Sequence, residues 1–136
     1  GIPLTGIEVG DSKLDGTKTS ITATGSPVEV VISQKSFNNY TSARYHVEIH
    51  NTTDDKYSVF VVASNCYGGN SNYTTYNNLS NATDPKRDIR ATDMLVAGTS
   101  SQLRFLPLAN KAYVVRVSEI IIDKPDSVAS NITISI

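Results

Sequence analysis

The chain has 136 residues, a formal net charge of −1 and 18% charged residues, and this length suits one domain with a single hydrophobic core. So weak a charge gives no strong field to gather nucleic acid or anionic lipid, so neither is expected as a partner. The polarity comes instead from 16 Ser, 14 Thr and 11 Asn residues, a composition typical of an extracellular surface.

The beginning of the sequence and its apolar runs bear on its location. It starts at Gly1 without a charged and apolar leader, so we expect a mature, secreted chain after removal of a signal peptide. No apolar run approaches the roughly 20 residues that cross a bilayer, so we expect no membrane span. Cys66 is the single cysteine, which excludes a disulfide within the chain.

Alternation of apolar and polar residues predicts β-strands along most of the chain. It is clearest at residues 43–50, where Tyr45, Val47 and Ile49 share one face. Residues 56–64 are apolar on both faces, as in a central strand, and the polar residues 51–55 between these two segments predict a hairpin. The same test predicts further strands at residues 2–9, 17–24, 28–34, 94–97, 102–106, 111–122 and 128–136.

A polar stretch interrupts this pattern at residues 65–90, which contain almost no aliphatic side chain. We expect a long polar, glycosylated loop there, with at most a short edge strand near residues 73–76. Short strands separated by turn residues favour an all-β fold. We therefore predict an immunoglobulin-like β-sandwich of about 8–9 strands with Greek-key connections.

Six Asn-x-Ser/Thr sequons are the sharpest local motif, and most fall in the predicted loop or in predicted turns. As candidate sites of N-linked glycans we take Asn39, Asn51, Asn72, Asn78, Asn81 and Asn131. The alternative is that a surface rich in Asn, Ser and Thr contains sequons that carry no glycan.

No enzyme signature is present: the sequence lacks a phosphate-binding loop, a nucleophile elbow and a paired-cysteine motif. His46, Glu48 and His50 share one strand face, but a solvated face explains them better than a metal site, because no further ligands are apparent. Ordinary turn chemistry likewise accounts for the acidic residues at 11–16 and 54–55. We expect no catalytic residues, no metal and no cofactor.

The N-terminal segment has the features of a strand that one molecule lends to another. Its apolar residues are Ile2, Leu4, Ile7 and Val9, and the polar residues 10–16 resemble a hinge. We therefore divide the chain into a donor-strand-like segment with its hinge (1–16) and a sandwich domain (17–136). In donor-strand complementation such a segment fills the groove of a neighbouring subunit. The alternative is that residues 2–9 form the first strand of their own sandwich.

With its lendable N-terminal strand, its sequons and its lack of disulfides, the chain resembles the subunits of archaeal surface filaments, in particular thread-type pilins assembled by donor-strand exchange. The resemblance implies a glycan-coated extracellular filament of identical subunits joined head to tail, serving adhesion or cell-to-cell contact. The alternative function is an extracellular binding module, as in a virion surface protein, an S-layer or a receptor ectodomain, that forms no filament.

Overall fold

The computed structural model describes residues 7–9, 12–35, 42–67, 70–90, 94–97 and 100–122. These residues form nine strands and one short helix. Their bounds are β1 Ile7–Val9, β2 Ser12–Thr22, β3 Val30–Lys35, β4 Ser42–Asn51, β5 Lys56–Tyr67, β6 Asn70–Ser80, α1 Pro85–Asp88, β7 Leu95–Ala97, β8 Ser101–Phe105 and β9 Ala112–Ile122.

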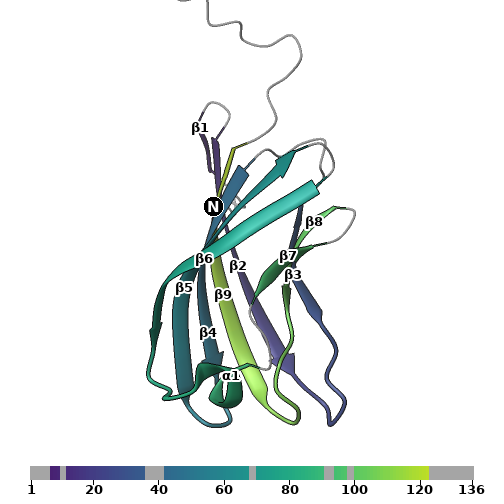
Figure 1. Cartoon of the computed structure of the whole chain (residues 1–136), viewed down its shortest axis with the longest axis vertical. Helices are drawn as coiled ribbons and strands as arrows, with labels where there is room; N and C mark the ends of the chain where they lie inside the picture. The colour runs from purple at the N-terminus through teal and green to yellow at the C-terminus, as the bar shows by residue number, and fades with distance from the viewer. Residues whose placement is uncertain are drawn as a thin grey trace, which may run out of the picture.

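The strands make two antiparallel sheets that pack face to face (Figure 1). The large sheet has six strands in the order β1-β2-β9-β4-β5-β6, and the small sheet has three in the order β3-β8-β7. At the sides of the sandwich, β2 lies against β3 and β6 lies against β7. The prediction of an all-β fold in two sheets is therefore confirmed.

Alternation of side chains determines which surface of the large sheet is buried. In β4, the odd-numbered residues from Ala43 to Asn51 are buried, while Arg44 and His46 are exposed. β9 shows the same alternation from Tyr113 to Ile121. Because residues directly opposite in neighbouring strands share a face, the sheet has an inner face toward the small sheet and an outer face away from it.

The hydrophobic core lies between the two sheets. At its lower end, Phe105 of β8 meets Tyr113 of β9 edge to face, with ring centroids 5.1 Å apart, a geometry that aromatic quadrupoles favour. Other fully buried side chains come from both sheets and from the segments that join them: Tyr45, Val47, Ile49, Phe60, Val62, Ile89, Met94 and Leu103.

One ion pair crosses the core. Lys35 Nζ of β3 lies 2.9 Å from Glu119 Oε2 of β9, and the Glu119 side chain is only 1% exposed. Neither carboxylate oxygen makes a well-directed hydrogen bond to another described residue. A charge in this position is tolerated only because its partner is close, since removing either member leaves the other buried alone.

The β4–β5 hairpin is built around a buried amide. Asn51 Oδ1 accepts hydrogen bonds from the backbone N–H groups of Thr53 and Asp54, both at 3.1 Å. Its Nδ2 donates to Asp54 Oδ2 at 3.1 Å and to the carbonyl oxygen of Asp88 at 3.0 Å. Asp55 completes the turn with a positive φ of 54°, which Asp tolerates better than most residues. The predicted hairpin is present, and Asn51 also ties it to α1.

The structure replaces much of the predicted loop at 65–90 with regular elements. β5 continues to Tyr67, β6 occupies Asn70–Ser80 and α1 occupies Pro85–Asp88. β6 is an edge strand that pairs with β5 alone, and an edge strand needs fewer apolar residues than a central one. Its Tyr and Thr residues favour strands, so the shortage of aliphatic residues was misleading.

β2 begins earlier than the strand predicted at residues 17–24. Residues 12–16, expected in the hinge, form the first part of β2 and are paired with β9 throughout. The predicted strand at residues 128–136 lies outside the described residues.

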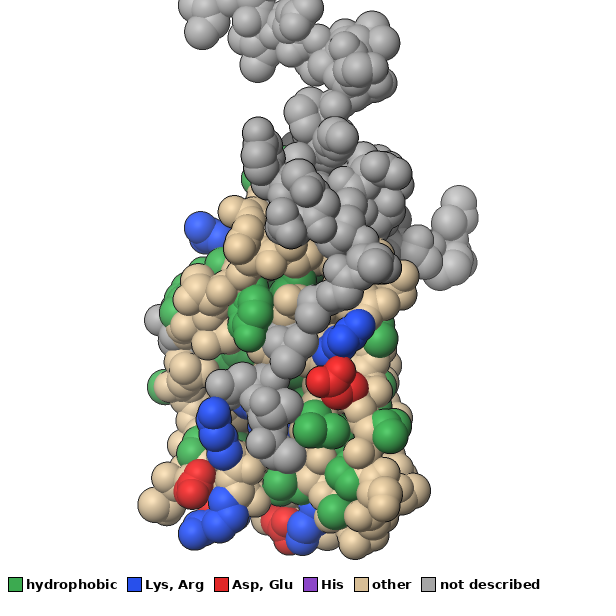
Figure 2. All heavy atoms as spheres, turned by 45° about the vertical axis from the view of Figure 1, so that its right-hand side comes forward, with side chains coloured by type: hydrophobic (Ala, Val, Ile, Leu, Met, Phe, Trp, Pro, Cys, Tyr) green, Lys and Arg blue, Asp and Glu red, His purple; other side chains and the backbone are tan. Residues whose placement is uncertain are grey.

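The surface carries few charges. On the face shown in Figure 2, backbone and uncharged polar side chains predominate, with scattered hydrophobic side chains and small groups of charged ones. Among the described residues there is no helix of the length and hydropathy required to cross a membrane.

Candidate functional site

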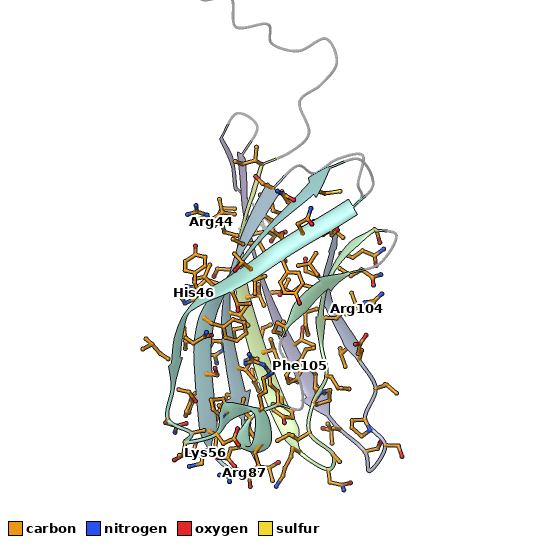
Figure 3. The ribbon with its side chains drawn as sticks, viewed as in Figure 1. Arg44, His46, Lys56, Arg87, Arg104 and Phe105 are labelled. Carbon is orange, nitrogen blue, oxygen red and sulfur yellow. The ribbon has the colours of Figure 1, made fainter. Side chains whose placement is uncertain are left out.

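The outer face of the large sheet is the broadest regular surface of the described residues. Figure 3 shows Arg44 and His46 on this outer side, Phe105 between the sheets and Arg104 on the opposite side of the molecule. The outer face carries several large apolar side chains that remain about half exposed, including Leu14, Ile120 and Ile122. Exposed apolar groups gathered on a monomer commonly mark a binding surface.

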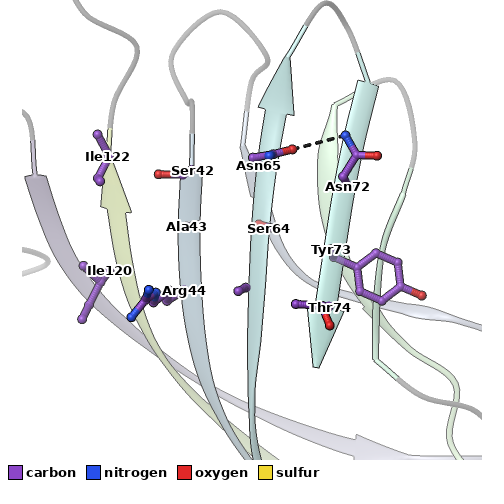
Figure 4. Close-up of a pocket in the computed structure, with 11 residues that line it drawn as sticks. Ser42, Ala43, Arg44, Ser64, Asn65, Asn72, Tyr73, Thr74, Ile120 and Ile122 are labelled. Carbon is purple, nitrogen blue, oxygen red and sulfur yellow. Dashed lines mark hydrogen bonds between the residues drawn. The ribbon is translucent and has the colours of Figure 1, made fainter. Parts of the chain in front are cut away.

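The upper end of this face is hollowed into a depression of about 690 Å³ (Figure 4). Ile120 and Ile122, which are 53% and 48% exposed, lie on its β9 side. Polar side chains form most of the remaining wall: Ser42, Arg44, Asn65, Asn72 and Thr74. Asn72 Nδ2 donates a hydrogen bond of 3.2 Å to Asn65 Oδ1, which orients two amides side by side. The upper depression therefore combines apolar surface with hydrogen-bonding groups.

A second depression of about 440 Å³ lies lower on the same face. It is open because Gly16 has no side chain and Ser118, directly opposite on β9, has a short one. Longer side chains surround it: Lys18, His46, Glu48 and Arg116. A Cβ on Gly16 would come no closer than 3.7 Å to Val117 O, so packing does not demand glycine there.

The two depressions are electropositive. They include Lys18, Arg44 and Arg116 but only one carboxylate, Glu48, although the chain as a whole has a net charge of −1. Lys18 lies directly opposite Arg116, and like charges in that relation destabilise a sheet. Among the described residues, no ion pair neutralises either of these two cations. The pairing of Lys18 with Arg116 is therefore unfavourable for folding, although Glu48 lies opposite Arg116 on its other side, and a role in binding would account for it.

The three side chains noted on one strand face in the sequence, His46, Glu48 and His50, do not form one site. His46 borders the lower depression. His50 instead turns toward the hairpin, where its ring stacks on Tyr57 at 4.0 Å and its Nε2 lies 2.9 Å from Asp55 Oδ1. No three metal-binding side chains of the His, Cys, Asp or Glu type cluster in the part of the chain that the structure describes.

The sequons occupy different environments. Asn51 is 0% exposed, and its Nδ2 donates to Asp54 Oδ2 in the hairpin and to Asp88 O of α1. A glycan on that nitrogen is incompatible with this arrangement. Asn72, Asn78 and Asn81 are exposed. Asn39 and Asn131 lie outside the described residues.

Asn81 has a structural role beside its sequon. Its Oδ1 accepts a hydrogen bond of 2.7 Å from the Tyr57 N–H, and its Nδ2 donates to Asp55 O at 3.3 Å. Asn72 and Asn78 belong to β6, and a β-bulge interrupts the β5–β6 ladder near Asn78. A bulge at an edge discourages pairing with other strands.

The N-terminal segment is described only in part. Ile2 and Leu4 lie outside the described residues, and Ile7 and Val9 belong to β1, which pairs with β2 of the same chain. Only residues 12–14 of the eleven in β2 have a partner on this side among the described residues. Among the described residues, no strand pairs with residues 16–22 of β2 on this side, and we call this stretch the β2 edge.

Sequence reasoning placed His46, Glu48 and His50 together on one strand face but missed Lys18 and Arg116 as their neighbours. Local alternation shows which residues share a face of one strand. The order of strands brings β2, β9 and β4 together, and no local signal in the sequence specifies that order.

Comparison with known proteins gives a likeness of fold only. No protein-family profile matches the chain, and no curated protein matches its sequence. Among solved structures it is similar to a tailspike protein, gp49 from Acinetobacter baumannii bacteriophage Fri1, described as a capsular polysaccharide depolymerase. The TM-score is 0.51 at 11% identity, and the match covers 86% of this chain but only 19% of the tailspike.

Proposed function

We propose that the chain is a non-catalytic structural subunit of an extracellular filament, in which the N-terminal segment of one copy adds to the β2 edge of the next. The β2 edge is the observation that carries this proposal. An edge of this length to which no described strand is paired is a template for another strand, and main-chain hydrogen bonds along it would supply affinity.

The register of β1 suggests how the segment fits. Ile7 lies opposite Leu14 and Val9 opposite Ser12. If the pairing of β1 with β2 continued residue by residue toward the N-terminus, Leu4 would lie opposite Thr17 and Ile2 opposite Thr19. Both threonines are on the inner face, because their β9 partners are buried valines. The apolar residues at 2 and 4 would then extend the core.

For two copies to exchange the N-terminal segment, the short pairing between β1 and β2 within each copy must be broken. Among the described residues, β1 and β2 share three residue pairs within the chain, and a swapped segment would remake the same pairs with the neighbour, as in domain swapping. Because β1 lies at the upper end of the sandwich and the β2 edge along its side (Figure 1), the proposed contact is head to tail. Such a contact repeats without closing and yields a filament.

We also propose the finer classification of the fold as immunoglobulin-like with Greek-key connections. In the order β9-β4-β5-β6, a later strand returns beside the first of three consecutive strands, as in a Greek key. Tyr113 near the start of β9 accepts a hydrogen bond of 3.0 Å at its hydroxyl from the Leu108 N–H. This contact resembles the tyrosine corner of immunoglobulin-type sandwiches.

A glycan at Asn78 would suit this assembly. Asn78 is exposed on β6, the edge of the large sheet opposite to β2 and β1. A bulky group there would prevent pairing at β6 and leave the β2 edge for growth. Glycosylation implies an extracellular location, where adhesion or cell-to-cell contact is the proposed role.

The second candidate is an extracellular binding module that forms no filament, such as a virion surface domain. The two depressions on the outer face favour it. The structural neighbour named above is a bacteriophage tailspike, so a sandwich of this fold within a virion surface protein has a precedent.

Sedimentation velocity and negative-stain imaging of the full chain test the filament. We expect extended particles whose length grows with concentration. A variant that lacks residues 1–6 keeps β1 and should remain monomeric with an unchanged circular dichroism spectrum. Leu4→Asp should do the same, because an unpaired carboxylate is costly in an apolar site. A full chain that stays monomeric, or a truncated chain that still forms fibres, would refute the proposal.

A further inference from the structure

We propose that the outer face of the large sheet binds an acidic polysaccharide, with Arg44 and Arg116 holding carboxylates at two separate subsites. This inference is independent of strand exchange, because it concerns the outer face and not the β2 edge. It rests on the charge of the two depressions, on their spacing and on the character of their walls.

The spacing follows from the registers of β9. Arg44 lies opposite Ile120, and Arg116 is four residues earlier on the same strand, β9. At about 3.4 Å per residue, the two guanidinium-bearing positions are about 14 Å apart along the strand direction. Lys18, directly opposite Arg116, adds a second cation at the lower position. Two cationic points separated by uncharged surface match a polymer whose charges are spaced by neutral units.

The lower depression is shaped for an anionic group. With Gly16 and Ser118 on its floor and Lys18 and Arg116 beside it, a carboxylate can approach both cations at once. Arginine binds carboxylates through two parallel N–H groups, which adds direction to the attraction. The carboxylate of Glu48, which lies opposite Arg116 on β4, repels a bound anion. The affinity of this subsite therefore depends on that single negative charge.

The upper depression suits the neutral part of a sugar chain. The Asn65 and Asn72 amides, which are paired at 3.2 Å, retain further donors and acceptors for hydroxyl groups. Ile120 and Ile122 offer apolar surface on which the C–H face of a sugar ring can pack. Sites for small polar ligands commonly combine apolar walls with a few fixed polar groups.

The charge density favours a polysaccharide over other polyanions. Nucleic acid presents a phosphate at every nucleotide, and its binding depends on many cations that neutralise them. The two depressions contain three cations and one carboxylate, on a chain of net charge −1. An anionic membrane would likewise require a denser basic surface. By contrast, a polysaccharide that has a carboxylate on every second sugar needs only widely spaced cations.

Titration of the full chain with hyaluronan fragments, which carry a carboxylate on alternate sugars, tests the inference by calorimetry. Neutral dextran, single-stranded DNA and anionic lipid vesicles serve as comparison ligands. We expect saturable binding of hyaluronan that weakens as salt is raised, and at least tenfold weaker binding of the other three. Equal or tighter binding of dextran, DNA or vesicles would overturn the proposal.

Variants locate the site. Arg44→Gln and Arg116→Gln should each weaken binding about five- to tenfold, whereas Glu48→Gln should strengthen it severalfold. Arg87→Gln is the matched control, since it removes the same charge from α1, at the lower end of the molecule (Figure 3). All four should unfold at the wild-type temperature. Wild-type affinity in both arginine variants, or an equal loss in Arg87→Gln, would refute the assignment.

Discussion

Replacement of Asn51 by alanine should destabilise the protein more than a change at any of the exposed residues 52–55 of the turn between β4 and β5. The amide makes four hydrogen bonds of 3.0 to 3.1 Å, two as acceptor and two as donor. Each contributes about 0.5–1.5 kcal/mol net, and the exposed turn allows water to replace part of them. We therefore expect a loss of about 2–4 kcal/mol in the free energy of unfolding.

Equilibrium unfolding in urea measures this loss. With a slope of about 2 kcal/mol per M, the transition midpoint should fall by about 1–2 M while the slope stays unchanged. Asn72→Ala is the matched control, because it removes an exposed amide whose one described hydrogen bond is to Asn65. Its effect should stay within about 0.5 kcal/mol. An Asn51 variant as stable as this control would show that the buried amide does not hold the hairpin.

Three further perturbations test the packing and the charges. Lys35→Met should lower the free energy of unfolding in urea by about 3–5 kcal/mol, because Glu119 is left buried without its partner. Adding Glu119→Leu should restore most of this stability. A loss below about 1 kcal/mol in Lys35→Met would contradict the pairing. The hydrogen bond from Lys111 lowers the pKa of Asp54. The stability that this pair contributes is therefore complete above the ordinary pKa of 3.8 and is lost as the pH falls through the lower folded-state pKa. Over that pH window, the difference in stability between wild type and Lys111→Met should shrink. Burial raises the pKa of Tyr113, so the stability of the folded protein should decline as the pH rises above 10.0, the ordinary pKa of tyrosine. Thermal unfolding of Tyr113→Phe should show no such decline. At neutral pH, this variant should be about 1 kcal/mol less stable than wild type.

The sequence specified the central strands well, because their residues alternate. In β4, the series Tyr45, Val47 and Ile49 is buried as the pattern predicts. In β9, alternation from Tyr113 to Ile121 likewise reports burial correctly. These strands lie in the middle of the large sheet, where one face must be apolar, so local pattern and tertiary structure agree.

Prediction failed where tertiary context outweighs local pattern. β6 has Leu79 as its one aliphatic residue in Asn70–Ser80, yet it forms a full strand because β5 supplies its hydrogen-bond partners. The inner position of Glu119 also breaks the rule that charges lie outside, and only the approach of Lys35 from the other sheet explains it. Pairings of this kind join residues far apart in the chain.

The candidate binding face was predictable in part. Alternation alone places Arg44 and Glu48 on one side of their strand, but the two neighbouring cations, Lys18 and Arg116, come from two other strands. For the sequons, the motif was visible in the sequence, whereas the burial of Asn51 depends on its contact with α1, which the sequence did not reveal.

Disulfide cross-linking between separately prepared single-cysteine chains tests strand exchange most directly. Leu4→Cys and Thr17→Cys are made in a Cys66→Ser background, mixed and oxidised. Opposed residues in antiparallel strands have Cα atoms about 4.5–5.5 Å apart, within the range that a disulfide spans. Strand exchange predicts a disulfide-linked dimer in the mixture that neither variant forms alone. If the mixture gives none, while a chain carrying both cysteines closes into a cross-linked monomer, the N-terminal segment belongs to its own sandwich and the filament account is wrong.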